Sequence, residues 1–224
     1  RIEQDPKDAA SWANRGVLRL HHHDYEGADR DFDEAIRLAP ADVYTLFWRG
    51  DLYSKMGRYS EAMDAYNEAI RLDPTNPSGF GHRGRCYAEQ GRYAEAIADF
   101  TVEARLDPGS ASAYFNRAMA RSDEEVRDYD GALSDFDAFF RLEHDCTELI
   151  TGAHGLRAFV YIALGLYREA IADLDEKINL TPWDADAYLV RSWLHKKTGD
   201  GVRAAEDRRK ALELDPRVLD PEKD

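Results

Sequence analysis

The sequence predicts an all-α, right-handed solenoid of stacked helix–turn–helix units. A proline returns every 34 residues and closes a similar sequence each time, such as EAIRLAP, which ends at Pro40, and EAIRLDP, which ends at Pro74. A fixed period of this length is typical of arrays whose units are too small to fold alone and therefore stack on their neighbours. The recurring prolines are Pro6, Pro40, Pro74, Pro108, Pro182 and Pro216.

Six units account for most of the chain. The fourth is degenerate, because Pro182 follows Pro108 by 74 residues, six more than two periods, and its turn is enlarged. We expect the units at 7–40, 41–74, 75–108, 109–144, 145–182 and 183–216, with 1–6 as the end of a preceding truncated unit and 217–224 as a tail. These two ends predict that the chain is a piece of a longer array or multidomain protein.

The first helix of each unit opens with a large residue, followed three and four positions later by an arginine and a small residue. These spacings place the three side chains on one helical face. The sets are Trp12, Arg15 and Gly16; Leu46, Arg49 and Gly50; Phe80, Arg83 and Gly84; Tyr114, Arg117 and Ala118; His154, Arg157 and Ala158; and Tyr188, Arg191 and Ser192.

A turn and a second helix complete each unit. The turn usually reads Gly-x-Tyr, as at Gly57 to Tyr59, and the second helix carries small and aromatic residues in the spacing of Ala62, Tyr66 and Ala69. Proline then ends the helix, because it cannot continue the backbone hydrogen bonding. His23 and residues 198–201 alter the turns of the first and last units, and the fourth unit lacks both the turn glycine and the final proline.

The chain resembles the tetratricopeptide repeat family in this period and in the order of large, small, Gly-x-Tyr, alanine, aromatic and proline positions. The resemblance covers residues 8–216. It departs from the family pattern at Glu103, where a small apolar residue is usual, and at Arg208, which replaces the last aromatic. It implies a non-catalytic protein-interaction scaffold whose ligand surface is the inner face, formed mainly by the first helices.

Composition restricts the partners. The net charge of −14 argues against nucleic acid and anionic membranes, and it is compatible with a basic protein partner. The sequence contains no apolar run that approaches the length of a membrane span. Cys86 and Cys146 form no disulfide framework, which favours a cytoplasmic location.

We expect no cofactor, metal or catalytic residue. Residues 79–84 spell G-x-G-x-x-G, but a turn precedes them rather than the strand that a dinucleotide site needs. His21 to His23 are consecutive, whereas helical metal ligands lie four apart. A weak metal candidate remains around the insertion, with His144, Asp145, Cys146, Glu148 and His154.

The arginine of the first helix has an expected partner. An aspartate follows it by sixteen residues in four units, and by eighteen in the fourth, which has two extra residues in its turn. We interpret these pairs as structural cross-helix ion pairs, with a ligand-reading arginine ladder as the alternative. They are Arg15 with Asp31, Arg83 with Asp99, Arg117 with Asp135, Arg157 with Asp173, and Arg191 with Asp207; the second unit has Ala65 instead.

The candidate binding surface is an aromatic and apolar groove on the first helices. It suits a peptide or an amphipathic helix, and the alternative is that some of its rings pack between repeats. Its residues are Tyr44, Phe47, Trp48, Asp51, His82, Arg85, Phe115, Asn116, Met119, Phe159 and Trp193. None of the six first helices carries the Lys and Asn pair, four residues apart, with which some members of the family hold a C-terminal carboxylate.

Two other functions remain open: a regulatory or targeting module of a larger enzyme, and self-association through uncapped ends. The irregular stretch between Ser122 and Gly155, with a connection at 145–150, predicts a change of curvature or a hinge. We expect the four units before it and the two after it to move as blocks.

Overall fold

The computed structural model describes residues 7–218, which form twelve α-helices and no strand. The predicted end of a preceding unit at 1–6 lies outside the described residues, as does the tail from 219 onward. The helices are α1 (Ala9–His21), α2 (Tyr25–Leu38), α3 (Val43–Lys55), α4 (Tyr59–Leu72), α5 (Pro77–Glu89), α6 (Tyr93–Leu106), α7 (Ala111–Ser122), α8 (Tyr129–Leu142), α9 (Thr147–Ala163), α10 (Tyr167–Leu180), α11 (Ala185–Lys197) and α12 (Gly201–Leu214).

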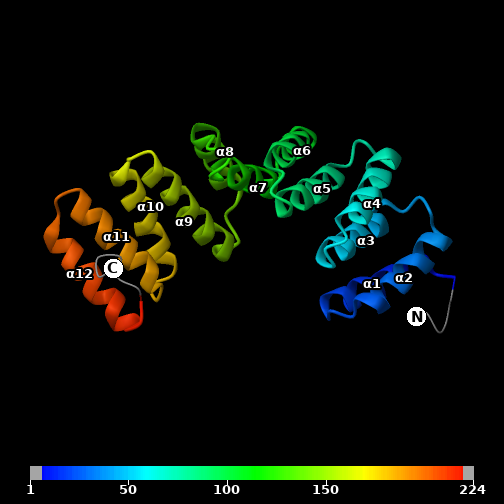
Figure 1. Cartoon of the computed structure of the whole chain (residues 1–224), viewed down its shortest axis with the longest axis horizontal. Coiled ribbons are helices and arrows are strands. Elements are labelled where there is room, and N and C mark those ends of the chain that lie inside the picture. The colour runs from blue at the N-terminus through cyan, green and yellow to red at the C-terminus, as the bar shows by residue number, and fades with distance from the viewer. Residues whose placement is uncertain (1–6, 219–224) are drawn as a thin grey trace. The chain divides into compact units, whose positions relative to one another are not determined.

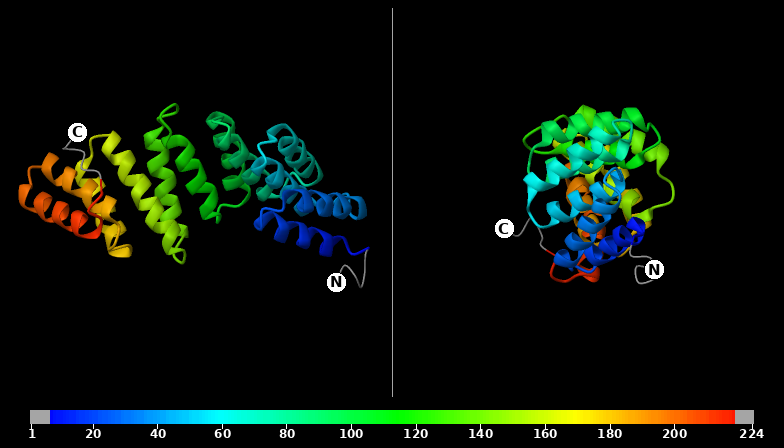
Figure 2. Two further views of the ribbon diagram at one scale, coloured as in Figure 1. Left: turned by 60° about the horizontal axis from the view of Figure 1, so that its bottom comes forward. Right: turned by 90° about the vertical axis from the view of Figure 1, so that its right-hand side faces the viewer.

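The chain divides into two compact units, residues 1–120 and 121–224. In unit one, α1 packs on α2, α3 on α4 and α5 on α6, and contacts also join α2 to α3 and α4 to α5. Figures 1 and 2 show the two members of each pair lying side by side. The pairs therefore stack in chain order, each pair being one predicted repeat.

Unit two repeats this arrangement. Contacts join α8 to α9 and α10 to α11, and the pairs α9–α10 and α11–α12 pack most extensively. The predicted all-α solenoid is confirmed, and its right-handed sense stays a prediction.

The core of unit one is built from rings that pack on small residues. Phe32, Tyr66 and Phe100 of the second helices are at most 1% exposed. A Cβ added to Gly16 would lie 2.6 Å from Phe32, and one added to Gly84 would lie 2.7 Å from Phe100. The small residue of the first helix is therefore needed so that the ring of the second helix can approach it.

The predicted connection at 145–150 is wrong in its extent. The helix α9 already begins at Thr147 and runs for 17 residues. Glu143 holds the shorter connection between α8 and α9, because its carboxylate accepts hydrogen bonds from the backbone N–H groups of Asp145 and Cys146 at 3.0 Å. The two compact units divide after Ala120, two residues before the end of α7, whereas the predicted movement of four units against two stays a prediction.

Positive backbone φ angles mark the turns between paired helices. Four turns place a glycine there: Gly57 at 72°, Gly91 at 72°, Gly165 at 73° and Gly199 at 88°. The first and fourth repeats place His23 at 61° and Arg127 at 53° in the equivalent turns. In the first repeat, the N–H groups of His23 and Asp24 close the helix by donating to the carbonyls of Leu20 at 3.1 Å and Arg19 at 2.9 Å. In the fourth repeat, Asp128 N–H donates to the Arg121 carbonyl at 2.9 Å.

We expect His23→Gly to raise the free energy of unfolding by about 1 kcal/mol, because glycine adopts positive φ without a Cβ clash. The side-chain contact that is lost, from His23 Nδ1 to the Tyr25 hydroxyl at 3.1 Å, is exposed to solvent. Urea unfolding measures the change. Gly57→Ala is the matched control, since its added Cβ would meet no atom within 4 Å, and it should lose stability through conformation alone. A His23→Gly protein no more stable than the parent would contradict this account.

Candidate functional site

An arginine fork joins the two helices of a repeat. In four repeats, Nε and Nη2 of the first-helix arginine donate to the two carboxylate oxygens of the aspartate sixteen residues later, at 2.6–2.8 Å. The pairs are Arg15 with Asp31, Arg83 with Asp99, Arg157 with Asp173, and Arg191 with Asp207. All four aspartates are buried. Two parallel charge-assisted hydrogen bonds fix both distance and orientation, so the fork sets how the paired helices pack.

The arginine has a further arm that reaches the preceding repeat. Its Nη1 donates to a polar side chain of the preceding second helix, at 2.6 Å from Arg83 to Asn67 and at 2.6 Å from Arg191 to Asp175. Sequence reasoning missed these partners, although a polar residue recurs two positions after each aspartate position. The acceptors of Nη1 are Asn67, Thr101, Asp137 and Asp175, and the equivalent Asp33 pairs with Nη2 of Arg49 instead.

The large residue of the first helix covers this ion pair. The guanidinium carbon of Arg15 lies 4.7 Å from the centre of the Trp12 ring, and that of Arg191 lies 5.5 Å from the Tyr188 ring. A ring over a guanidinium adds a cation–π interaction and keeps water from the ionic hydrogen bonds.

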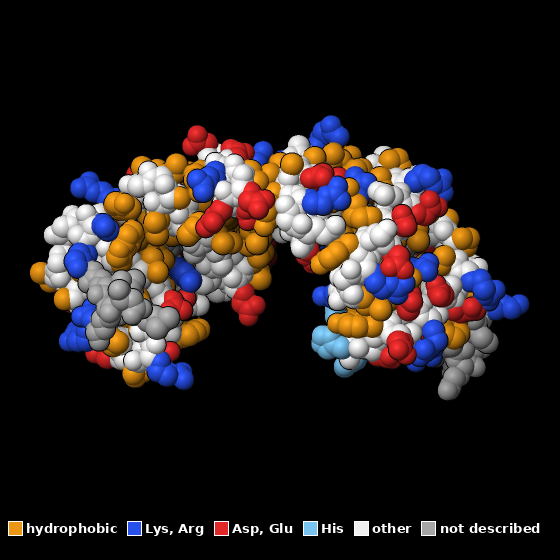
Figure 3. All heavy atoms as spheres, in the orientation of Figure 1, with side chains coloured by type: hydrophobic (Ala, Val, Ile, Leu, Met, Phe, Trp, Pro, Cys, Tyr) orange, Lys and Arg blue, Asp and Glu red, His pale blue; other side chains and the backbone are white. Residues whose placement is uncertain are grey.

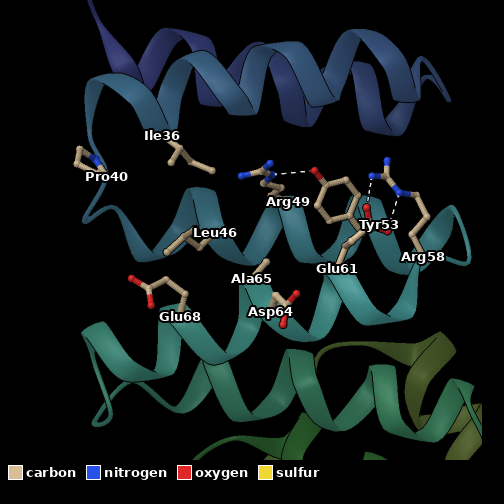
Figure 4. Close-up of a pocket in the computed structure, with 10 residues that line it drawn as sticks. All are labelled: Ile36, Pro40, Leu46, Arg49, Tyr53, Arg58, Glu61, Asp64, Ala65 and Glu68. Carbon is tan, nitrogen blue, oxygen red and sulfur yellow. Dashed lines mark hydrogen bonds and ion pairs between the residues drawn. The ribbon is translucent and has the colours of Figure 1, made fainter.

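The second repeat departs from this arrangement at two positions. Ala65 replaces the aspartate and Leu46 replaces the ring beside Arg49. Nε of Arg49 instead donates to the Tyr53 hydroxyl at 3.0 Å, and Nη2 lies 2.9 Å from Asp33. Figure 4 shows this arginine in an open groove between α2 and α4, with α3 as its floor.

The fourth repeat straddles the divide between the units. Arg117 belongs to unit one and Asp135 to unit two, so their pairing stays a prediction. Within unit one, Nη1 of Arg117 donates to Thr101 at 3.2 Å. Within unit two, Asp135 accepts from Nη1 of Arg121 at 2.8 Å.

A polar cluster lies on the first helices of unit one. Asp51 accepts a hydrogen bond from the Tyr66 hydroxyl at 2.7 Å and lies 2.8 Å from Nδ1 of His82, with Arg85 at 3.9 Å. Burial raises the pKa of Asp51, but the bonds from His82 and Tyr66 and the charge of Arg85 outweigh burial and leave the pKa below its usual value. The cluster lines a small pocket of about 100 Å³ together with Cys86.

Phe47 corrects the predicted aromatic groove. Its side chain is 2% exposed, because it packs under Gly79 and stacks on His82 with ring centres 5.3 Å apart. Trp48 and Phe115 are partly buried. Tyr44, by contrast, is 61% exposed. The first-helix surface of unit one is therefore more polar than predicted, with one prominent ring.

The remaining predicted groove residues keep some exposure. Met119 of α7 and Phe159 of α9 are exposed, and Asn116 and Trp193 are partly buried. In unit two, Trp193 lies edge-on to Tyr167, with centres 5.9 Å apart.

Glu103 is a buried charge that sequence reasoning noted as a departure but did not place in a site. It points from α6 onto α5, where a Cβ on Gly81 would lie 2.7 Å from its Oε1. Its Oε2 is buried and has no hydrogen-bond partner among the described residues. Burial raises the pKa of Glu103 to about 7, although Arg85 acts in the opposite direction. A glycine facing a charged residue was the available signal, and it recurs in unit two, where Lys177 crosses Gly155 and binds Asp184 at 2.7 Å.

No group of three or more His, Cys, Asp or Glu side chains in residues 7–218 is arranged to hold a metal ion. Of the weak candidate cluster, His154 lies 2.8 Å from Asp173 and takes part in the fork of its own repeat. None of the helices in the described part of the chain is both long and apolar enough to cross a membrane.

Comparisons with known proteins agree with this geometry. Sequence models of the tetratricopeptide repeat match residues 43–76 and residues 65–98. Residues 43–98 are thus assigned to the tetratricopeptide repeat family, and the same stacking of helix pairs in the other repeats supports that assignment. No curated protein has a matching sequence.

Solved structures of similar fold cover nearly the whole chain. Pseudomonas aeruginosa pilF superimposes with a TM-score of 0.78 at 18% identity, covering 98% of both chains. PilW, a type IV pilus biogenesis factor, gives 0.77 at 15% identity, covering 96% of this chain and 97% of its own. A chain of the APC/C hetero-tetramer Cut9-Hcn1 gives 0.72 at 16% identity; the match covers 97% of the present chain but only 42% of that one. At these identities the likeness extends to the fold alone.

We expect Arg83→Leu to lower the free energy of unfolding by about 2–4 kcal/mol, because Asp99 is left buried without its partner. Thermal and urea unfolding measure the loss. The double variant Arg83→Leu with Asp99→Leu is the control, since removing both charges avoids the unpaired carboxylate and should recover most of the stability. A single variant as stable as the parent would contradict a structural role.

We expect stability to fall as pH rises through the window from about 4.5 to about 7, because the folded state binds a proton on Glu103 that the unfolded state has released. Glu103→Gln should therefore be more stable than the parent by about 2 kcal/mol at pH 8 and equal to it near pH 4.5. Urea unfolding across this range tests both ends. Glu26→Gln, at an exposed position, should show no such pH-dependent difference in stability from the parent.

Proposed function

We propose that the chain is a non-catalytic scaffold that binds a peptide or an amphipathic helix through the exposed faces of its first helices. The observation that carries this proposal is the exposure of large side chains there: Tyr44 is 61% exposed, Phe159 52% and Met119 46%. Apolar groups of this size are costly to leave in water and are typical of interaction hot spots.

The polar cluster supplies orientation for such a ligand. Asp51 and His82 hold fixed positions beside the exposed Arg85, so a backbone carbonyl or amide of a bound peptide meets preorganised hydrogen-bonding groups. The exposed ring of Tyr44 lies on the same helix as Asp51. One region of unit one thus offers an exposed ring for an apolar side chain of the ligand and polar groups that can orient its backbone.

The charge of the chain favours a basic partner. The net charge is −14, and Figure 3 shows acidic and basic side chains interspersed over the visible face rather than gathered into one basic patch. An overall negative field raises the association rate of positively charged ligands. Two proteins of similar fold are a member of an APC/C hetero-tetramer and a type IV pilus biogenesis factor, and this supports an interaction role for the present chain.

A peptide selected from a random displayed library tests this function, with affinity measured by fluorescence anisotropy. Tyr44→Ala should weaken the peptides that bind unit one about tenfold, and Phe159→Ala those that bind unit two, corresponding to about 1.4 kcal/mol per site, while the fold stays intact. Val202→Ala is the matched control, because Val202 is 72% exposed on a second helix. Both variants binding as tightly as the parent, with unchanged melting, would overturn the proposal. Phe47→Ala is unsuitable here, because removing its buried ring should cost stability.

A further inference from the structure

The groove between α2 and α4 is chemically different from its counterpart in the last repeat. It has a volume of about 640 Å³ and contains Arg49 without an aspartate partner in its own repeat. The counterpart between α10 and α12, of about 500 Å³, contains Arg191 with both Asp207 and Asp175 bound. The chain therefore offers two grooves of similar size, one with a complete arginine fork and one with a vacant position.

Two residues of the second repeat differ from the pattern and remove contacts that the arginine has in other repeats. Ala65 stands where Asp31, Asp99, Asp173 and Asp207 accept the fork, and its short side chain leaves the carboxylate position empty. Leu46 stands where an aromatic ring covers the arginine in the first, third and sixth repeats. Among the described residues Arg49 keeps the Tyr53 hydroxyl and Asp33 as hydrogen-bond and ion-pair partners, its guanidinium lies 5.3 Å from the centre of the Tyr53 ring, and its charge acts on Glu61. No hydrogen bond from its Nη1 is formed within residues 7–218.

Apolar side chains gather at one end of the groove, where Glu68 also lies, and polar ones toward the other. Figure 4 shows Ile36, Pro40 and Leu46 at one end and Arg49, Tyr53 and Arg58 toward the other. An occupant that fits both ends has an aliphatic side chain next to an acceptor for the guanidinium.

The charges around the groove do not leave a surplus cation, so the selectivity for a carboxylate rests on the geometry of Arg49 rather than on net charge. Glu61 is held by the fork of Arg58, and Glu68 by the fork of Arg71 at 2.7 Å, so both acidic groups are already compensated. Asp33 neutralises part of the charge of Arg49. Asp64, on the rim, is exposed and opposes an incoming anion.

We propose that this groove binds an acidic side chain of a partner peptide, with its carboxylate beside Ala65 in the place that the repeat's own aspartate occupies elsewhere. An aliphatic neighbour in the peptide then packs on Ile36 and Leu46. This second site shares no lining residue with the pocket around Asp51, and it does not rest on the proposed function of the first helices. A bidentate arginine–carboxylate pair gives it geometric selectivity.

The test compares acetyl-Leu-Glu-amide with acetyl-Leu-Gln-amide, two probes that differ only in the charge of one side chain. Titration into the protein is followed by NMR at the side-chain Nε–H of Arg49, identified with an Arg49→Lys variant. The acidic probe should shift this resonance saturably in the millimolar range, and the neutral probe should bind at least tenfold more weakly. Equal binding of the two probes would overturn the proposal.

Substitutions in the two grooves supply the matched controls. Ala65→Asp fills the vacant position and should abolish binding of the acidic probe, and Asp64→Asn removes the rim charge and should strengthen it two- to fivefold, roughly as expected for one screened charge near a surface. Asp207→Ala together with Tyr188→Leu gives Arg191 the surroundings of Arg49 and should create a new acidic site in unit two. Undiminished binding to a folded Ala65→Asp protein would sink the assignment. If that variant fails to fold, unchanged binding in Asp64→Asn together with no gain in the unit-two variant would do the same.

Discussion

The fork between a first-helix arginine and a buried aspartate, present in four repeats, is the interaction on which the repeat architecture depends. One guanidinium joins three helices: it lies on the first helix, forks to a buried aspartate on its own second helix, and reaches a polar side chain on the second helix before it. The fork orients the helices within a repeat, while the third arm connects repeats. Small residues opposite aromatic rings bring the helices close, but those contacts are apolar and less directional. The ionic contacts therefore add the register that close packing alone does not set.

Where the chain departs from this pattern, charged side chains lack partners that charged groups have in the regular repeats. In the second repeat the fork is missing, and a groove lies open beside Arg49. In the third repeat a glycine admits the carboxylate of Glu103, which ends up buried and without a hydrogen bond for one oxygen. Both features weaken the scaffold locally, since an incomplete ion pair and a buried unpaired charge each carry a free-energy cost. In a protein built of otherwise similar units, such positions are the natural candidates for individual function.

The sequence was sufficient for the architecture and for much of the ionic framework. The period, the turn glycines and the sixteen-residue spacing of Arg15 and Asp31 are properties of a regular array, so local rules carry over from one unit to the next. Side-chain exposure was harder to predict. Phe47 shares its helical face with Tyr44, yet one is buried and the other exposed, because Gly79 of the next repeat leaves space into which Phe47 packs beside Ile70. The start of α9 was also missed, since a glutamate side chain closes the connection in place of the usual proline.

Each complete fork joins one positive and one negative side chain, so it contributes nothing to the net charge of the chain. The surplus of acidic groups, 44 against 30 lysines and arginines, therefore resides elsewhere, largely at the solvent surface. Dissolved ions screen exposed charges over about 8–10 Å at physiological concentrations but screen close, partly buried pairs much less. The molecule thus has two kinds of electrostatic interaction that differ in range and in their response to salt. Short-range pairs maintain the stack at any ordinary ionic strength, whereas the long-range field that governs encounters with other molecules varies with the salt around it.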